Sequence, residues 1–145
     1  MSTILLLHSI TRYLVLIALI GVIIQSLVGL LQKKPYGPLE NKSGLYLFIF
    51  THTQLLLGIL LYFTSSKVIF SGASMKDSFA RYWLVEHTFM MLVAVTLITL
   101  ARITAKKLSD DSAKHKRLLI FNSLALVLII TAIAMSGRGF FSLPS

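Results

Sequence analysis

Four apolar segments, each long enough to cross a lipid bilayer, constrain this chain more than any other feature. A bilayer core needs about 20 apolar residues in a helix. The qualifying segments are Ile4–Leu31, Gly44–Phe63, Tyr82–Ala101 and Leu118–Ser136. The 145-residue chain is 56% hydrophobic and 13% charged, which is more apolar surface than a soluble domain of this length buries. We therefore predict one all-α domain over residues 1–145, an integral membrane four-helix bundle with up-down-up-down topology.

The first segment also raises the question of a cleaved signal peptide. It lacks a basic region before its apolar stretch, and that stretch is longer than a signal peptide requires. We expect it to be retained as the first helix. The second connection, Thr64–Phe79, contains Ser and Gly but is moderately apolar, and we expect it to lie along the membrane surface.

The connections carry most of the charge, and its distribution predicts an orientation. Nine basic residues lie in or beside the first and third connections: Lys33, Lys34, Lys42, Arg102, Lys106, Lys107, Lys114, Lys116 and Arg117. Five lie on the other side: Arg12, Lys67, Lys76, Arg81 and Arg138. Under the positive-inside rule, the first and third connections are cytoplasmic and both termini are outside. The chain is then a multi-pass membrane protein.

Two further patterns agree with a membrane setting. Six aromatic residues fit a belt at the outer interface: Tyr62, Phe63, Tyr82, Trp83, Phe140 and Phe141. The basic residues are not interleaved with aromatic residues on one face, so the net charge of +9 indicates topology and no nucleic-acid partner. The lipid bilayer is the expected partner of the apolar segments.

Three histidines lie inside the apolar segments: His8, His52 and His87. Ionisable residues at such positions usually face a cavity, a partner or a cofactor. The chain has no cysteine, which excludes disulfides, iron–sulfur ligation and covalent attachment of c-type haem. Imidazoles are therefore the best groups in this chain for holding a redox metal. His115, between two lysines in the third connection, is instead predicted to be solvated.

His8 and Arg12 are four residues apart and share one face near the outer end of the first helix. Arginine stays charged, so Arg12 requires an anion or access to water, and a haem propionate would serve. His52 lies about nine residues into the second segment, roughly 13 Å along the helix and near the membrane centre. A neutral His52 that bonds to another helix is the structural alternative, with Thr51 or Gln54 as neighbours.

Of the three histidines, His87 has the most neighbours that could contact a cofactor. It follows Glu86, and Trp83, Met90 and Met91 lie near its face. These residues fit an ordinary core, and they also fit the face of a macrocycle. We consider three roles for Glu86: an ion pair with Arg12, orientation of an imidazole, or acceptance of a proton from a quinol.

The depths of the histidines separate the cofactor hypotheses. Measured from the cytoplasmic boundary, His52, His87 and His8 lie at about 13, 22 and over 30 Å. That spread disfavours a three-histidine metal site. It favours one non-covalent haem b with His87 as one axial ligand and either His52 or His8 as the other. The smaller offset slightly favours His52, which leaves His8 and Arg12 to meet propionates or a quinone.

Three motifs resemble a known family. They are His8-Ser-Ile-Thr-Arg-Tyr13, Thr51-His-Thr-Gln-Leu-Leu-Leu-Gly58 and Val85-Glu-His-Thr-Phe-Met-Met91. The chain resembles, over nearly its whole length, the small four-helix bacterial membrane proteins commonly labelled "cytochrome B". The resemblance implies a haem-b-binding inner-membrane protein with the three histidines at matching positions.

The expected function is that of a membrane b-type cytochrome that relays electrons, linked to the quinone pool and to a redox partner or larger respiratory complex. Such a protein transfers electrons and need not transform a substrate. Two alternatives remain open from the sequence. One is a non-redox accessory or assembly subunit of a larger complex, in which the polar residues bind helices. The other is a histidine-based metal-binding membrane protein.

Overall fold

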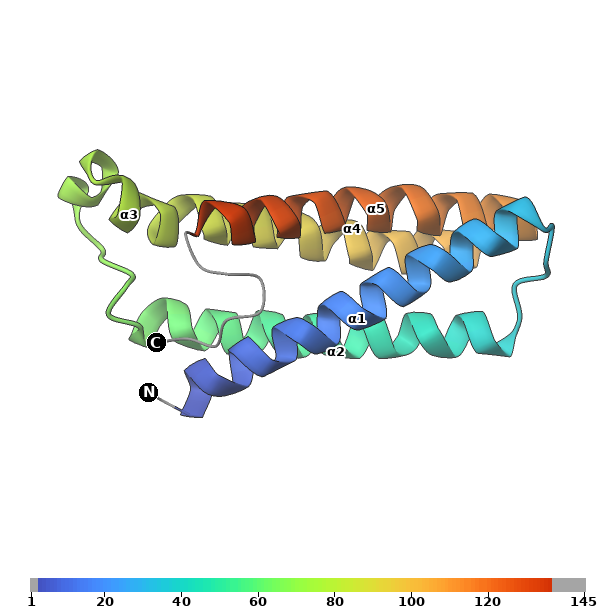
Figure 1. The fold of residues 1–145 in the computed structure, drawn as a ribbon, viewed down its shortest axis with the longest axis horizontal. Coiled ribbons are helices and arrows are strands. Elements are labelled where there is room, and N and C mark those ends of the chain that lie inside the picture. The colour runs from blue at the N-terminus through green and yellow to red at the C-terminus, as the bar shows by residue number, and fades with distance from the viewer. Residues whose placement is uncertain (1–2, 137–145) are drawn as a thin grey trace.

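A computed structural model describes residues 3–136, and within that range it contains helices and no strands (Figure 1). The elements are α1 (Thr3–Leu31), α2 (Pro38–Thr64), the 3₁₀ helix η1 (Gly72–Lys76), α3 (Ser78–Arg81), the π-helical turn η2 (Tyr82–Glu86), α4 (His87–Lys107) and α5 (Asp111–Met135). α3, η2 and α4 run on as one helix. Four helices are thus long and apolar enough to span a membrane, which confirms the predicted all-α four-helix membrane bundle.

The helices extend beyond the apolar segments that predicted them. α2 begins at Pro38 rather than Gly44, the third helix spans Ser78–Lys107 rather than Tyr82–Ala101, and α5 begins at Asp111 rather than Leu118. Capping groups explain two of these ends. The Glu40 carboxylate accepts a hydrogen bond from the Gly37 N–H at 2.9 Å, and Asp110 accepts one from the Ala113 N–H at 3.1 Å. Hydropathy marks the membrane core, whereas the caps decide where a helix starts.

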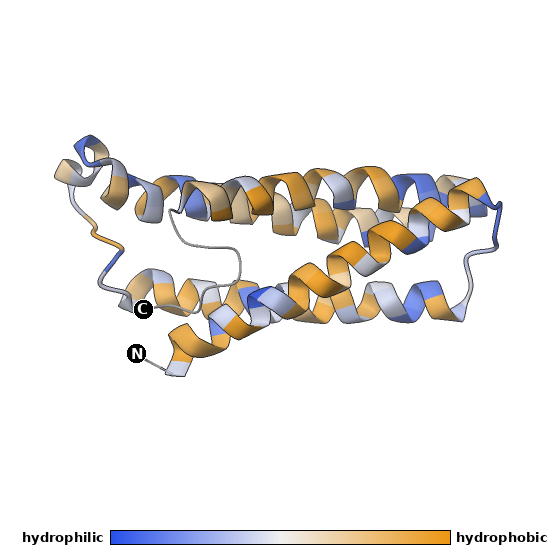
Figure 2. Ribbon diagram, viewed as in Figure 1, coloured by the Kyte–Doolittle hydropathy of each residue, from blue (hydrophilic) through white to orange (hydrophobic). Residues whose placement is uncertain are grey.

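The four long helices pack in a ring, with α1 between α2 and α5, and α4 between α5 and α2 (Figure 1). The α2–α4 contact is the weakest of the four. The core consists of small and branched apolar residues from all four helices: Leu19, Val22, Leu47, Ala94, Ile98, Ala125, Ile129 and Ile133. Many large hydrophobic residues are exposed, among them Ile17 at 70%. Hydrophobic residues run along the long helices (Figure 2). An apolar exterior is what a lipid-facing bundle requires.

The two connections 32–37 and 108–110 lie at one end of the bundle, which we call the basic end (Figure 1). The start of α1, the end of α2 and the connection 65–77 lie at the other, which we call the cavity end. This arrangement agrees with the predicted up-down-up-down topology. Arg138, Phe140 and Phe141, which entered the charge balance and the aromatic belt, lie outside the described residues.

The orientation in a membrane stays a prediction, and the absence of cysteine makes it simple to test. Ser66 lies in the connection at the cavity end, Ser109 lies in a connection at the basic end, and both are exposed. In right-side-out vesicles, a membrane-impermeant maleimide is expected to label Ser66→Cys at once. It should label Ser109→Cys only after permeabilisation. The opposite pattern would show that the basic end faces outward.

His115 is buried, so the prediction that it is solvated is wrong. Its side chain is 1% exposed, and Nε2 lies 2.9 Å from the Lys34 carbonyl oxygen. After α1 ends at Leu31, Lys33 adopts the left-handed conformation (φ 54°), and the Lys34 N–H donates to the Gly29 carbonyl at 2.9 Å. This turn brings the Lys34 carbonyl to α5. Gly29 leaves room for the imidazole, which occupies the helix crossing although its sequence neighbours are charged.

Candidate functional site

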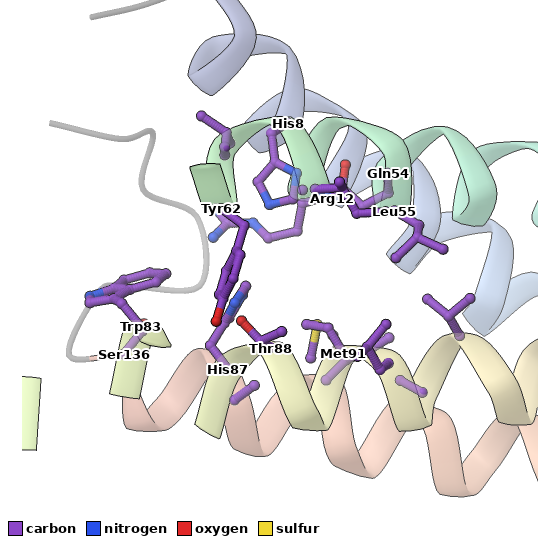
Figure 3. Close-up of a pocket in the computed structure, with 18 of the residues that line it drawn as sticks. His8, Arg12, Gln54, Leu55, Tyr62, Trp83, His87, Thr88, Met91 and Ser136 are labelled. Carbon is purple, nitrogen blue, oxygen red and sulfur yellow. The ribbon is translucent and has the colours of Figure 1, made fainter. Parts of the chain in front are cut away.

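A cavity of about 270 Å³ lies at the cavity end, between the α1–α2 pair and the α4–α5 pair (Figure 3). Its volume is close to the lower end of the range of about 300–1,000 Å³ found for small-molecule sites. Most of its lining is apolar. The polar side chains that line it include His8, Ser9, Arg12, Thr51, Gln54, Tyr62, Lys67, Tyr82, Trp83, His87 and Thr88. Toward this end α1 slopes away from α4 and α5, and the cavity lies between the two helix pairs (Figure 1).

α1 contributes His8 and Arg12, which line the cavity one turn apart, as their spacing predicts (Figure 3). The His8 ring packs on α2 at Gly58, where a Cβ would lie 3.4 Å from the His8 Cε1 atom. The Arg12 guanidinium donates a hydrogen bond to the Tyr13 hydroxyl at 3.0 Å and lies 4.9 Å from the Tyr13 ring centroid. Arg12 therefore places a permanent positive charge in the cavity wall.

α4 contributes His87 from the opposite side of the cavity, directly after the π-helical turn. The backbone N–H of His87 donates a hydrogen bond to the Tyr82 carbonyl, five residues earlier. The ring centroids of Tyr82 and Trp83 lie 5.8 and 5.1 Å from that of His87. Single π turns inside α-helices occur frequently at functional sites. This one brings two consecutive aromatic rings against the His87 imidazole.

Hydrogen bonds between the π turn and two other helices hold the turn in place. The Tyr62 hydroxyl of α2 donates to the Leu84 carbonyl at 2.9 Å, and the Tyr82 hydroxyl donates to the Ala132 carbonyl of α5. Tyr62 itself projects into the cavity (Figure 3). The backbone that carries His87 is therefore tied to both neighbouring helices, which restricts the imidazole before any ligand binds.

The connection 65–77 covers the end of the cavity. Phe70 packs against Tyr62 and Phe63, with ring centroids 5.2 and 5.9 Å apart. The Lys67 ammonium lies 5.1 Å from the centroid of the Trp83 ring, and Lys67 lines the cavity. From the sequence, Lys67 entered only the charge balance between the two sides of the membrane. Little in the sequence marks it as a cavity residue, because it is a single cation in a connection rich in Ser and apolar residues.

His52 does not line the cavity. Its Nδ1 lies 2.8 Å from the Phe48 carbonyl oxygen, and its Nε2 lies 3.5 Å from the Thr99 hydroxyl of α4. The Phe48 and His52 ring centroids are 4.1 Å apart. The preceding residue, Thr51, does line the cavity, and one residue of helix turns the side chain by about 100°. His52 thus lies where α2 and α4 meet.

The remaining candidates divide between the cavity and its surroundings. Trp83 and Met91 line the cavity, whereas Met90 and Glu86 are not among its lining residues. Glu86 accepts a hydrogen bond from Arg81 Nε at 2.7 Å in a salt bridge on the outside of the π turn. Of the three roles considered for Glu86, the geometry agrees with an ion pair, with Arg81 as the partner in place of Arg12.

The described lining of the cavity does not provide a set of side chains that could coordinate a metal ion directly. Over residues 3–136, no three His, Asp or Glu side chains come close enough to hold one. What the cavity does offer is two imidazoles, one permanent cation and apolar walls. Such a lining suits a cofactor that brings its own metal and most of its own ligands.

Comparisons with known proteins find no match to a family model, to a curated protein or to a solved structure. The class is therefore defined by the fold and the cavity, as a four-helix protein with membrane-spanning helices and a cavity lined by two histidines.

Proposed function

We propose that this protein is a membrane b-type cytochrome that holds one non-covalent haem between His8 and His87. The observation that carries the proposal is that these two imidazoles come from opposite helix pairs and line one cavity (Figure 3). A haem b held by two histidines would need their imidazoles on facing elements, and His8 and His87 would hold it in this way. When bound, haem supplies one-electron redox chemistry, and the protein relays electrons without transforming a substrate.

The rest of the lining suits the other parts of a haem. Met91 and Leu92 of α4 offer apolar surface to a flat macrocycle. Arg12 and Lys67 both line the cavity, so each can neutralise a propionate carboxylate. Burial and the nearby cations together adjust the reduction potential. We propose that the protein lies in the bacterial inner membrane. There it would pass electrons between the quinone pool and a redox partner or larger respiratory complex.

An absorption spectrum tests the proposal directly. Protein expressed with haem supplied and purified in detergent is expected to show a sharp low-spin b-type α-band after reduction by dithionite. Trp83, the only tryptophan, lines the cavity and provides a second readout, because bound haem should quench its fluorescence. A colourless preparation with unquenched Trp83 would contradict the proposal and leave the accessory-subunit hypothesis.

The second axial ligand is decided by comparing two variants. His8→Ala is expected to lose the low-spin spectrum, because it removes an imidazole from the cavity wall. His52→Ala should keep it, since the His52 nitrogens face Phe48 and Thr99. The measurement is the reduced α-band per mole of protein, with circular dichroism as the control for folding. Loss of the band in His52→Ala and its retention in His8→Ala would favour the His52–His87 pair.

A further inference from the structure

We propose that the deeper part of the cavity, at Thr51 and Gln54 of α2, binds the ring oxygen of a membrane quinone or quinol. The inference rests on the proposed electron-relay function, and it names the redox substrate and the side chains that hold it. Both residues line the cavity that His8 and His87 share. They are three residues apart on α2, so their side chains lie on neighbouring positions of one helix face.

The Thr51 hydroxyl is the first observation. Five threonines on the outside of the long helices donate to the carbonyl four residues earlier: Thr53, Thr64, Thr96, Thr104 and Thr131. This local bond is the usual way to satisfy a hydroxyl in a membrane helix. Thr51 does not make it, although it is only 2% exposed, and its Oγ1 atom is buried with no partner in the described structure.

The Gln54 amide is the second observation. Its Oε1 atom is also buried without a hydrogen-bond partner among the described residues. Leaving a buried polar atom without a partner costs about 1–3 kcal/mol. Thr51 and Gln54 each carry such an atom, lie less than one helical turn apart and line the cavity. This indicates that a polar group of a ligand forms hydrogen bonds with both atoms.

The chemistry of the two side chains selects the ligand class. A hydroxyl donates and accepts, and a carboxamide carries one acceptor and two donors. Together they can donate to a quinone carbonyl and accept from a quinol hydroxyl, so they suit an oxygen that changes between these states. A carboxylate only accepts, which makes a haem propionate a poorer match for Gln54 Oε1.

The depth of Thr51 in the membrane favours a lipid-soluble ligand. Thr51 lies at the middle of α2, about 20 Å from either end of the helix at 1.5 Å per residue. A water-soluble redox partner does not reach such a depth in a membrane. A quinone ring carried on an isoprenoid chain dissolves in the bilayer. We place its entry between α2 and α4, because these are the neighbouring helices in weakest contact.

The experiment uses the single tryptophan. Haem-free full-length protein is titrated with menadione while Trp83 fluorescence is recorded, with N-acetyltryptophanamide to correct for direct absorption. Wild type should show saturable quenching. Thr51→Val and Gln54→Leu should each weaken binding about three- to tenfold, the loss expected for one hydrogen bond. Thr53→Val is the matched control, because the Thr53 hydroxyl bonds within its own helix and faces outward, and it should bind like wild type.

The outcomes separate this inference from the haem proposal. Wild-type affinity in both Thr51→Val and Gln54→Leu would overturn the quinone site and leave the cytochrome proposal standing. Loss of the low-spin spectrum in haem-loaded Thr51→Val would place Thr51 in the haem site and also overturn it. Quenching sensitive to Thr51 in a protein that takes up no haem would support the quinone site and refute the haem. Circular dichroism and the thermal midpoint of each variant confirm that it folds.

Discussion

His87→Ala is expected to abolish the low-spin b-type spectrum and to weaken haem binding by more than about tenfold. A tenfold loss of affinity corresponds to about 1.4 kcal/mol of binding free energy, and removal of an iron–imidazole bond should exceed it. His87 is the histidine that both proposed ligand pairs share. Its ring also packs against both Tyr82 and Trp83, after a π turn that Tyr62 helps to hold.

The readouts are the reduced α-band and the haem-to-protein ratio after size-exclusion chromatography. Added imidazole provides a control, because it can enter the space left by the side chain and should restore the low-spin band at millimolar concentration. Rescue of that kind distinguishes a lost ligand from a misfolded bundle. A His87→Ala protein with a wild-type spectrum would refute both ligand pairs, and with them the cavity as the haem site.

Gly29→Ala is expected to destabilise the fold by about 2 kcal/mol or more, within or above the range of about 1–3 kcal/mol for overpacking. A Cβ at Gly29 would lie 2.5 Å from Cε1, 2.7 Å from Nε2 and 2.8 Å from Nδ1 of His115. The ring cannot move aside easily, since it is buried and bonded to the Lys34 carbonyl. The measurement is the midpoint of unfolding in detergent, by circular dichroism.

The chain contains a matched control for this substitution. Gly21 lies on the same helix, and a Cβ there would meet nothing within 4 Å. Gly21→Ala should therefore be neutral or stabilising by up to about 1 kcal/mol, because alanine favours a helix more than glycine. Combining Gly29→Ala with His115→Ala should recover part of the lost stability. A Gly29→Ala protein as stable as wild type would show that α1 and α5 do not cross as closely as described.

The sequence was most informative about the number of helices and least informative about their facing surfaces. Apolar length alone identified four spans, and the His8–Arg12 spacing correctly placed both residues on one face. The same reasoning slightly favoured His52 as the partner of His87 on depth. Depth along a helix says nothing about rotation around it, and His52 lies one position away from the cavity-lining Thr51.

His115 shows the same limit at the basic end. Its neighbours Lys114 and Lys116 indicated a solvated loop, yet the residue occupies the crossing of α1 and α5. No local pattern marks this, because the contact joins residues far apart in the chain. The signal lay in the pairing of a glycine near the end of one helix with a histidine near the start of another.

An all-helical protein with four membrane-spanning segments follows from the amino-acid sequence, because hydropathy and segment length are properties of each stretch alone. The sequence also supplied the set of candidate groups: three histidines, one deep arginine and no cysteine. The packing of the helices shows that His8 and His87 share a cavity while His52 joins α2 to α4, and that Thr51 and Gln54 line that cavity. Those outcomes depend on how each helix is rotated and where two helices cross, which packing between distant residues sets.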